Sequence, residues 1–299
     1  MARATTLGVQ SGDLLNNYRL AERLEGQRSG ACFAATHAVL PRRAAIKIAA
    51  GEDRNLAAVR LLREACMLDA LQHPGVPRIY DAGVTSDRRP WFAREMFDGE
   101  SVAQHLWRGV LEPVDVAVLV RDVADTLAYA HGRGVIHGDL HAGVVRLTPS
   151  RRFGAAITDW SEAIAHDAKD ARPIMEGVHV APEVKAGDAI DDRADVYALG
   201  VLAYMALTGV APIPHVPVRT RRGSTPRELA RLIDQMLAPD RFDRPSAAEV
   251  FAELRERVTD EKVKDAPRMR RPRWTPPLPF AHLTGVVDLT DAVDDGWAE

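Results

Sequence analysis

The chain is short of cysteine, of net charge and of a leading apolar segment, and each shortage excludes a class of protein. Only two of its 299 residues are cysteine, Cys32 and Cys66, and neither has the spacing of a metal ligand. A disulfide-rich secreted domain is therefore excluded, and a reducing cytoplasm is the expected location. Residues 1–17 lack the apolar core of a signal peptide, so we expect none.

Net charge is small, and no long run of apolar residues is free of interruptions. The 39 Lys and Arg residues against 42 Asp and Glu residues leave a formal charge of −3. Nucleic-acid-binding domains are usually strongly basic, so we expect no nucleic-acid partner. The longest apolar run, residues 196–214, approaches membrane-spanning length, but two glycines interrupt it and it ends in prolines. We expect a buried core helix there and no membrane anchor.

Apolar periodicity and composition divide the chain into four parts. Residues 1–17 are a polar arm, and residues 18–97 are a β-rich small lobe with one helix. Residues 98–258 are a mainly helical large lobe, and residues 259–299 are a tail that is first basic and Pro-rich and then acidic. The arm is expected to be flexible. The predicted fold class is α+β with two lobes.

One helix of the small lobe and one of the large lobe are indicated by apolar spacing. Residues 55–71 place Leu56, Val59 and Leu62 at helical intervals, which predicts an amphipathic helix with this stripe. Residues 113–131 form a longer helix with a similar stripe. Both predictions depend on the 3.6-residue period of the α-helix.

Two later helices are indicated by their first residues. Thr225-Pro-Arg-Glu228 has the spacing of a capping box with proline at the first helical position, so it predicts a helix that runs to about residue 237. Ser246-Ala-Ala-Glu249 has the same spacing and predicts a helix that runs to about residue 258. Between residues 214 and 225 the chain is too short for a further helix of ordinary length.

Two acidic residues lie on turns beside short apolar runs, Asp139 in His137-Gly-Asp139 and Asp159 in Thr158-Asp-Trp-Ser161. One such carboxylate can orient a hydroxyl nucleophile while the other holds Mg²⁺ against nucleotide phosphates, as phosphoryl transfer requires. Taken alone, the two could equally be ordinary turn residues between strands. The motifs around them favour phosphoryl transfer.

These motifs, in this order, resemble the eukaryotic-like Ser/Thr protein kinases of bacteria over about residues 18–258. The matching pieces are Ala45-Ile-Lys47, Glu64, His137-Gly-Asp139, Asp159, Ala181-Pro-Glu183, Asp195 and Arg244-Pro245. The resemblance implies the two-lobed kinase fold, with a β-rich small lobe and a helical large lobe. It also implies ATP and Mg²⁺ as the cofactors of intact members.

The resemblance implies a role for each matching residue. Lys47 would contact nucleotide phosphates and pair with Glu64, with a surface salt bridge as the alternative for that pair. Asp139 would occupy the position of the catalytic base, and Asp159 would bind metal. The nucleotide-binding positions would be Gly30, Ala45, Lys47, Glu95 and Met96.

Three further residues are implied to support the large lobe. Glu183 and Arg244 would form a buried ion pair, which indicates the fold and not catalysis. Asp195 would accept backbone hydrogen bonds near the catalytic turn.

The nucleotide-binding positions depart from the family pattern. The loop that covers the phosphates keeps only Gly30, because Glu25 and Gln27 replace its other two glycines, which let backbone N–H groups approach phosphate. Arg94 and Arg146 occupy positions where the family lines the adenine slot with apolar side chains. A slip of one residue in either strand would turn these arginines outward, so both orientations remain open.

The catalytic positions depart from the pattern as well. Gly138 replaces an arginine, His141 replaces a lysine, and Val144 replaces the asparagine that helps to hold Mg²⁺. Valine has no lone pair to offer a hard cation. The activation segment, residues 162–180, contains no Ser, Thr or Tyr, so it cannot be phosphorylated.

These losses predict a pseudokinase: a kinase fold that acts as a binding or regulatory module for a protein partner, with weak or no nucleotide binding. The alternative is an active atypical Ser/Thr kinase or a small-molecule phosphotransferase that uses ATP and Mg²⁺. The segment His137-Gly-Asp-Leu-His141 also resembles the catalytic loop of small-molecule phosphotransferases. The retained Lys47, Glu64, Asp139 and Asp159 argue for the alternative. Residues 268–280 of the tail, which mix basic, aromatic and proline residues, are expected to dock on the domain or on a partner, or else to be disordered.

Overall fold

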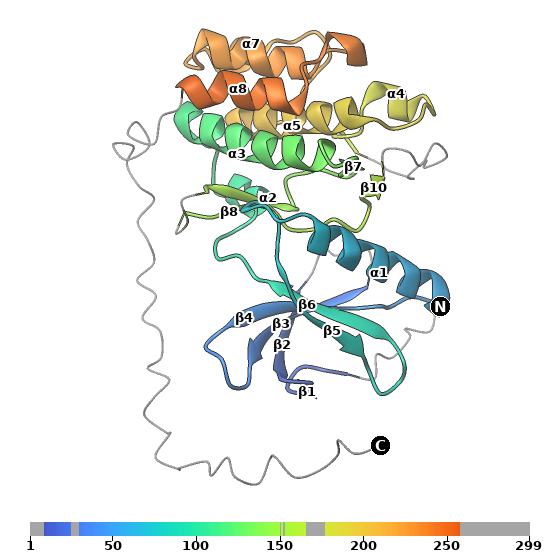
Figure 1. Ribbon diagram of the computed structural model, residues 1–299. Helices are drawn as coiled ribbons and strands as arrows, with labels where there is room; N and C mark the ends of the chain where they lie inside the picture. The colour runs from blue at the N-terminus through green and yellow to red at the C-terminus, as the bar shows by residue number, and fades with distance from the viewer. Residues whose placement is uncertain (1–8, 25–29, 150, 152, 166–176, 258–299) are drawn as a thin grey trace, which may run out of the picture. The chain divides into compact units, whose positions relative to one another are not determined.

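The computed structural model of the protein describes residues 9–24, 30–149, 151, 153–165 and 177–257 (Figure 1). Within this range the chain forms a small sheet-based lobe followed by a larger, mainly helical lobe, which confirms the predicted α+β two-lobed class. The predictions for Glu25, Gln27 and the tail from residue 259 lie outside the described residues.

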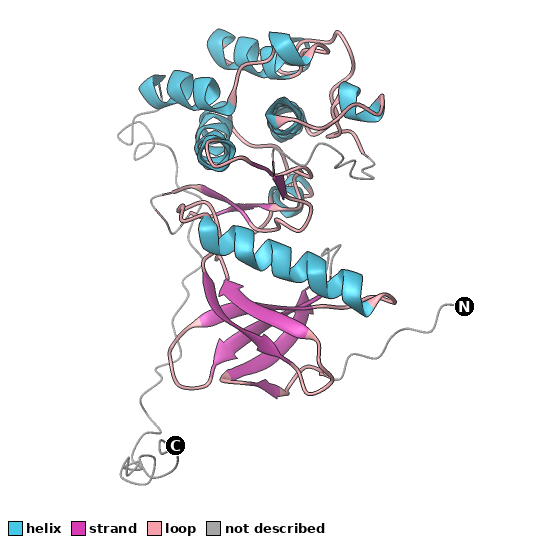
Figure 2. Ribbon diagram, turned by 45° about the vertical axis from the view of Figure 1, so that its right-hand side comes forward, coloured by secondary structure: helices cyan, strands magenta, loops and turns pink. Residues whose placement is uncertain are grey.

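The small lobe is built on a six-stranded antiparallel sheet with the order β1-β2-β3-β4-β6-β5. Its strands are β1 (Leu14–Leu15), β2 (Tyr18–Leu24), β3 (Ala31–His37), β4 (Arg43–Ile48), β5 (Ile79–Val84) and β6 (Pro90–Glu95). A single long helix, α1 (Arg54–Ala70), lies along one side of this curled sheet (Figure 2). β1 lies in the segment that was predicted to be a flexible arm, and it pairs instead with the start of β2.

The register between β4 and β6 decides where the cleft side chains of the small lobe point. Successive side chains of a strand alternate between the two faces of a sheet. Ile46 and Ala93 lie on the face that forms the small lobe's own core, so Ala45 and Lys47 lie on the opposite face. Arg94 pairs directly with Ala45, and its side chain is only 4% exposed. Arg94 is therefore turned inward on the face that carries Lys47.

Helix α1 is confirmed, but its predicted buried face is wrong. The fully buried side chains are Leu61, Glu64 and Leu68. The predicted apolar stripe is exposed by 48%, 58% and 51% at Leu56, Val59 and Leu62. Two sets of residues in this helix have helical spacing, and the buried one contains Glu64, whose carboxylate bonds to Lys47 on the sheet.

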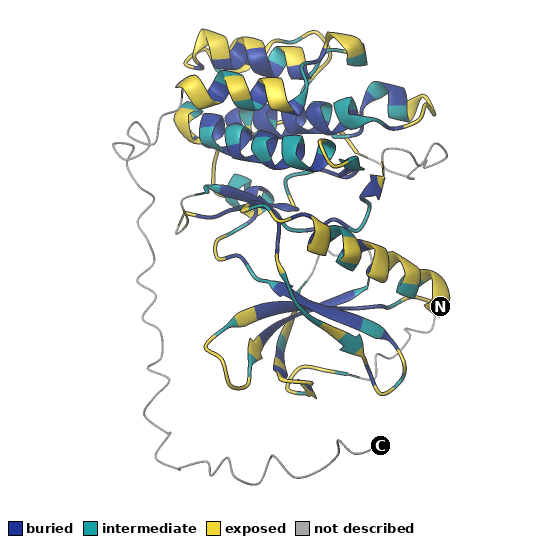
Figure 3. Cartoon of the chain, in the orientation of Figure 1, coloured by how far each residue is buried: buried dark blue, intermediate teal, exposed yellow. Residues whose placement is uncertain are grey.

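The large lobe packs its helices around a buried pair, α3 (Pro113–His131) and α5 (Asp192–Thr208), which appear mostly blue and teal in Figure 3. The other helices are α2 (Val102–Leu106), α4 (Pro182–Lys185), α6 (Val218–Arg221), α7 (Arg227–Met236), the 3₁₀ turn η1 (Arg241–Asp243) and α8 (Ala247–Arg257). Two short antiparallel strand pairs complete it, β7 (Val135–Ile136) with β10 (Ile164–Ala165) and β8 (Val145–Leu147) with β9 (Ala155–Ile157).

The long apolar run forms α5, which is buried along most of its length as predicted. Among the described residues no helix is long and apolar enough to cross a membrane. The segment predicted to be too short for an ordinary helix holds α6, a helix of four residues.

The two predicted capping boxes have different outcomes. At the start of α8 the Ser246 N–H donates to Glu249 Oε2 at 2.7 Å and the Glu249 N–H donates to Ser246 Oγ at 3.2 Å, so this box is confirmed. The first box is wrong: α7 begins at Arg227 without a side-chain cap. A turn bond from the Thr225 N–H to Arg222 O holds Thr225 ahead of the helix, where its buried hydroxyl has no hydrogen-bond partner.

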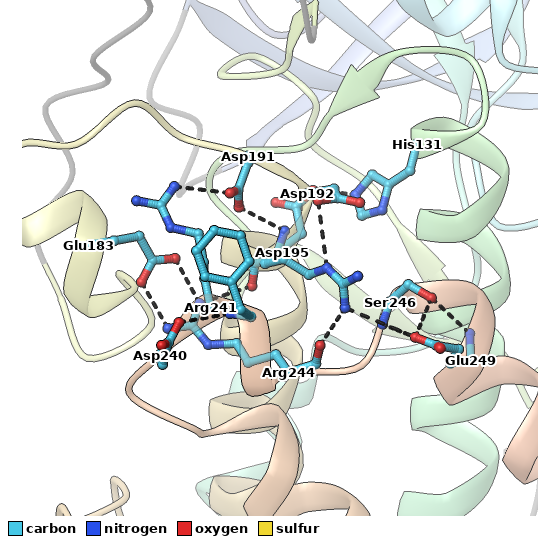
Figure 4. Close-up of polar contacts among 12 residues, drawn as sticks. His131, Glu183, Asp191, Asp192, Asp195, Asp240, Arg241, Arg244, Ser246 and Glu249 are labelled. Carbon is cyan, nitrogen blue, oxygen red and sulfur yellow. Dashed lines mark hydrogen bonds and ion pairs between the residues drawn. The ribbon is translucent and has the colours of Figure 1, made fainter.

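The predicted buried ion pair of the large lobe is present (Figure 4). Arg244 donates to both carboxylate oxygens of Glu183, at 2.7 and 2.8 Å, and both side chains are almost completely buried. The same guanidinium donates to the carbonyls of Ala238 at 2.7 Å and Pro239 at 3.0 Å. It thereby fastens α4 to the turn that precedes η1.

We expect Arg244→Leu to lower the free energy of unfolding by about 3–5 kcal/mol, because it leaves a buried carboxylate without its partner. Chemical denaturation of the two proteins measures this. The matched control is Arg231→Leu, which breaks an exposed pair with Glu253 and should cost about 0–1 kcal/mol. Equal costs at the two sites would contradict the bracing role of Arg244.

Neighbouring leucines of α1 provide a second test. Leu61 is buried and Leu62 is half exposed, so Leu61→Ala should destabilise by about 2–5 kcal/mol while Leu62→Ala should stay within about 0.5 kcal/mol. Thermal or urea unfolding distinguishes the two. A large loss at Leu62 would mean that the predicted stripe is covered in solution.

Candidate functional site

Three charged side chains from different elements meet between β4, α1 and the turn after β9. Lys47 Nζ lies 2.7 Å from Glu64 Oε2 and 3.1 Å from Asp159 Oδ1. All three residues are at least 95% buried. The predicted pairing of Lys47 with Glu64 is confirmed, and the alternative of a surface salt bridge is wrong.

Burial and mutual charge set the ionisation of this group. Burial alone would raise the pKa of Asp159, but Lys47 and then Arg94 outweigh it and hold the pKa at about 2. Burial would lower the pKa of Lys47, yet the adjacent Glu64 and Asp159 carboxylates raise it. For Glu64 burial dominates and raises the pKa. At neutral pH the site therefore presents a lysine cation held by the Asp159 anion.

The catalytic-loop backbone is held by Asp195 at the start of α5. The N–H groups of His137 and Gly138 donate to its two carboxylate oxygens at 2.8 and 2.9 Å, as predicted for this residue. His131 Nε2 donates to the same carboxylate at 2.8 Å (Figure 4). Gly138 has a φ of +83°, and a Cβ there would lie 2.9 Å from the Glu162 carbonyl oxygen, so glycine suits this turn.

His137 connects this loop to the turn that carries Asp159. Its Nδ1 accepts the N–H of Asp139 at 3.3 Å, so its Nε2 carries the proton and donates to the Asp159 carbonyl at 2.7 Å. The imidazole packs edge-on against the buried Trp160 ring, with the ring centroids 4.8 Å apart. The two acid-bearing turns are thus one connected unit.

Asp139 is flanked by two histidines. His179 Nε2 lies 2.8 Å from Asp139 Oδ1, and His141 Nε2 lies 3.9 Å from Oδ2. The two imidazole centroids are 5.3 Å apart. Because His141 Nδ1 accepts the Gly143 N–H at 3.1 Å, its protonated Nε2 faces Asp139. The carboxylate expected to receive a substrate hydroxyl is already engaged within the chain.

His179 was not identified from the sequence. It lies two residues before the Ala181-Pro-Glu183 motif, and a single histidine in a loop carries no signal of its own. Its contact with Asp139 joins residues 40 positions apart, so only the folded activation segment reveals it. Because the motif follows the activation segment, the residues just before it could have been considered as contacts of the catalytic loop.

The metal-binding positions offer few oxygen ligands. Val144 is 6% exposed and packs in the main apolar core, so no side-chain ligand replaces the missing asparagine. Asp159 supplies one carboxylate, but its Oδ1 is shared with Lys47 and with the Ser161 N–H at 3.2 Å. Among the described residues no cluster of three His, Cys, Asp or Glu side chains is arranged to hold a metal. This donor set does not fit the paired Mg²⁺ ions of a kinase.

The two arginines of the predicted nucleotide-binding region are buried to different extents. Arg94 is buried and its Nε has no hydrogen-bond partner. Arg146 is partly buried and donates to the Gly99 carbonyl. Burial lowers the pKa of Arg146, and the positive charges of Arg94 and Arg43 lower it further. The open question of orientation is settled for Arg94, which is turned inward.

The remaining predicted nucleotide-binding residues belong to the small lobe. Ala45 lies on the face of Lys47, and Glu95 and Met96 follow at the end of β6, where Glu95 binds Arg151. Gly30 has a φ of +93°, and a Cβ there would lie 2.5 Å from the Ile48 carbonyl oxygen. Close packing against β4 is therefore sufficient to require glycine at position 30.

Comparison with known proteins agrees with this geometry. The protein kinase domain pattern matches residues 25–254. A serine/threonine-protein kinase of Mycobacterium tuberculosis, PknJ, is 27% identical over 92% of this chain and 50% of its own length. The serine/threonine-protein kinase pkn3 of Myxococcus xanthus is 29% identical over 82% of this chain and 51% of its own length.

A third relative, the serine/threonine-protein kinase PrkC of Bacillus subtilis, is 26% identical over 86% of this chain and 42% of its own length. The chain thus spans about half the length, or less, of these curated relatives. The matched domain covers most of the chain, and its ordered motifs lie where the fold requires them. The chain therefore belongs to the protein kinase family, among the eukaryotic-like Ser/Thr kinases of bacteria.

Proposed function

We propose that this chain is a pseudokinase, a kinase-fold regulatory module that acts by binding a protein partner and not by transferring phosphate. One observation carries the proposal: the Asp139 carboxylate is bonded to His179 at 2.8 Å. Phosphoryl transfer depends on positioning and on metal charge, and the nucleophile must be oriented by this carboxylate. A substrate hydroxyl would have to displace the histidine first.

The metal-binding positions give the proposal further support. Val144 contributes only apolar surface where a second metal ligand is required, and Asp159 is neutralised by Lys47 within the protein. A metal ion bound by Asp159 would therefore compete with Lys47 for the same carboxylate oxygen. Loss of one preorganised electrostatic contact costs enzymes on the order of 10²–10³ in rate, and at least two such contacts are missing here.

Weak or absent nucleotide binding is part of the same proposal. Arg94 places a buried guanidinium on the face of Ala45 and Lys47, and Arg146 lies close enough for the two charges to repel. Filling a slot for a neutral purine with two cations removes apolar contact area and leaves little room for the base. The charged slot thus favours a binding function that does not depend on ATP.

An active atypical kinase or small-molecule phosphotransferase is the second candidate. The assembled Lys47–Glu64–Asp159 group favours it, because this group is what an ATP- and Mg²⁺-dependent kinase keeps in place for transfer. The relatives bear the names of serine/threonine-protein kinases. Nucleotide binding and transfer assays on the whole chain separate the two candidates.

We expect no melting shift for the wild-type chain at micromolar ATP, with or without Mg²⁺. A ligand at about a hundred times its Kd would add roughly 2.7 kcal/mol, which corresponds to roughly 5–10 °C for a domain of this size. Replacing both obstructing arginines, Arg94→Thr with Arg146→Leu, should produce a shift that the wild type lacks.

A clear shift of the wild type at micromolar ATP contradicts the prediction. If the double variant behaves like the wild type, the arginines are not the obstruction. Should the wild type bind after all, Lys47→Met ought to weaken binding more than Asp139→Asn, because only the lysine is expected to touch phosphate.

We also expect no measurable phosphorylation of the chain itself or of a generic protein substrate with Mg²⁺ or Mn²⁺. Radiolabelled phosphate transfer, followed over hours, measures this. The control is Asp139→Asn, which should give the same background as the wild type. Robust transfer by the wild type that disappears in Asp139→Asn would identify the chain as an unusual enzyme.

A further inference from the structure

Four charged side chains are buried where the sheet of the small lobe, α1 and the turn after β9 meet. Lys47 and Arg94 come from the sheet, Glu64 comes from α1, and Asp159 comes from the turn. Each of these residues is at least 95% buried. Two carboxyl groups therefore share the interior with two basic groups, and Lys47 alone carries too little charge to balance both carboxylates.

Arg94 differs from the other three residues because it makes no direct polar contact. Its Nε is buried without a hydrogen-bond partner, and among the described residues its guanidinium forms no ion pair. A buried charge that nothing compensates is strongly destabilising. The charge of Arg94 must therefore be compensated through space by groups that lie close to it.

The strand register indicates which groups these are. Arg94 pairs with Ala45 and Lys47 pairs with Phe92, so the two cations are diagonal neighbours on one face of the sheet. Diagonal neighbours lie about 7–8 Å apart, a distance that long side chains bridge. The carboxylates that contact Lys47 are thus within electrostatic range of Arg94 as well.

The ionisation of both carboxyl groups responds to Arg94. Burial raises the pKa of Glu64, and Lys47 and more weakly Arg94 oppose that rise. Burial would also raise the pKa of Asp159, but Lys47 and then Arg94 hold it at about 2. Arg146, the other cation near Arg94, is only partly buried and bonds to a backbone carbonyl. Arg94 is therefore the second buried cation of this site.

We propose that Arg94 is the resident cation of the site: its charge takes the place of a bound metal ion and keeps the three-residue group around Lys47 assembled without a ligand. The donor set does not fit the paired Mg²⁺ ions of a kinase, and the arginine supplies positive charge from the protein itself. Glu64 then holds α1 against the sheet at all times, so the small lobe presents one fixed surface to a partner. This inference rests on the proposed function, because only a module that works without ATP requires a site that is assembled without ATP.

The sign of one substitution separates this positioning role from a buried charge that is merely tolerated. Arg94→Met removes the charge and keeps much of the side-chain length. If nothing depended on Arg94, methionine would raise the stability, because the cost of a buried charge would disappear. If Arg94 is the resident cation, the same change leaves two carboxylates with one lysine and lowers the stability. Arg94→Lys keeps the charge and should retain most of the wild-type stability.

A double-mutant cycle with Asp159→Asn identifies the partner. Urea unfolding of the four proteins gives the unfolding equilibrium constant of each. The double variant keeps Lys47 and Glu64 as a balanced pair, so its loss should be smaller than the two single losses predict, by a factor on the order of ten in that constant. The matched control is Arg89→Met, which removes an arginine that is 3% exposed and pairs with Asp87. Its cycle with Asp159→Asn should be additive within about twofold.

Amide hydrogen exchange supplies a local measurement. Arg94→Met should raise exchange in α1 more than in α5 of the large lobe, and Arg94→Lys should not. An Arg94→Met protein as stable as the wild type, an additive cycle with Asp159→Asn, or unchanged exchange in α1 would overturn the proposal. Should Arg94→Met be too unstable to purify, Arg94→Gln takes its place in all three measurements. Phosphate transfer by the wild type would contradict the proposed function whatever the cycle gives.

Discussion

A continuous series of buried polar contacts connects the core of the large lobe to the helix of the small lobe. Asp195 binds the backbone of the catalytic loop, and His137 of that loop donates to the carbonyl of Asp159. The Asp159 carboxylate holds Lys47, which in turn holds Glu64 on α1. Each member is buried and would be costly to leave without its partner. The position of α1 against the sheet and the shape of both acid-bearing turns depend on this series, whatever chemistry the site performs.

This dependence explains how a kinase framework can persist while its chemical positions change. The residues that maintain the series are retained, whereas Val144 and His141 lie outside it and replace a metal ligand and a phosphate-binding lysine. Arg94 adds a positive charge beside the series and helps to hold the pKa of Asp159 low, so it supports the framework from the sheet face that carries Lys47.

The sequence predicted the fold class, the Lys47–Glu64 pair and the backbone contacts of Asp195, because each motif has a fixed place in the order of elements. It did not predict the contacts of His137 and Lys47 with Asp159. It could not choose between two helical stripes in α1, since both have the same period and only packing decides. The Thr225 box failed because a preceding turn held that residue away from the helix, which local spacing cannot report. The inward orientation of the Arg94 side chain could be decided only from the observed register between β4 and β6. His179 was missed because its partner, Asp139, is 40 residues away in the chain.

In the resting protein the carboxylate of Asp139 is occupied by the His179 imidazole. Histidine-selective ¹⁵N nuclear magnetic resonance of the full chain tests this directly, with His179→Gln to assign the signal. We predict a slowly exchanging Nε2–H resonance of His179 that disappears in Asp139→Ala, which removes the acceptor, while the His137 resonance, bonded to the Asp159 carbonyl, is kept. A His179 side chain whose proton exchanges rapidly with water in the wild type, and whose signal is unchanged by Asp139→Ala, would contradict this contact.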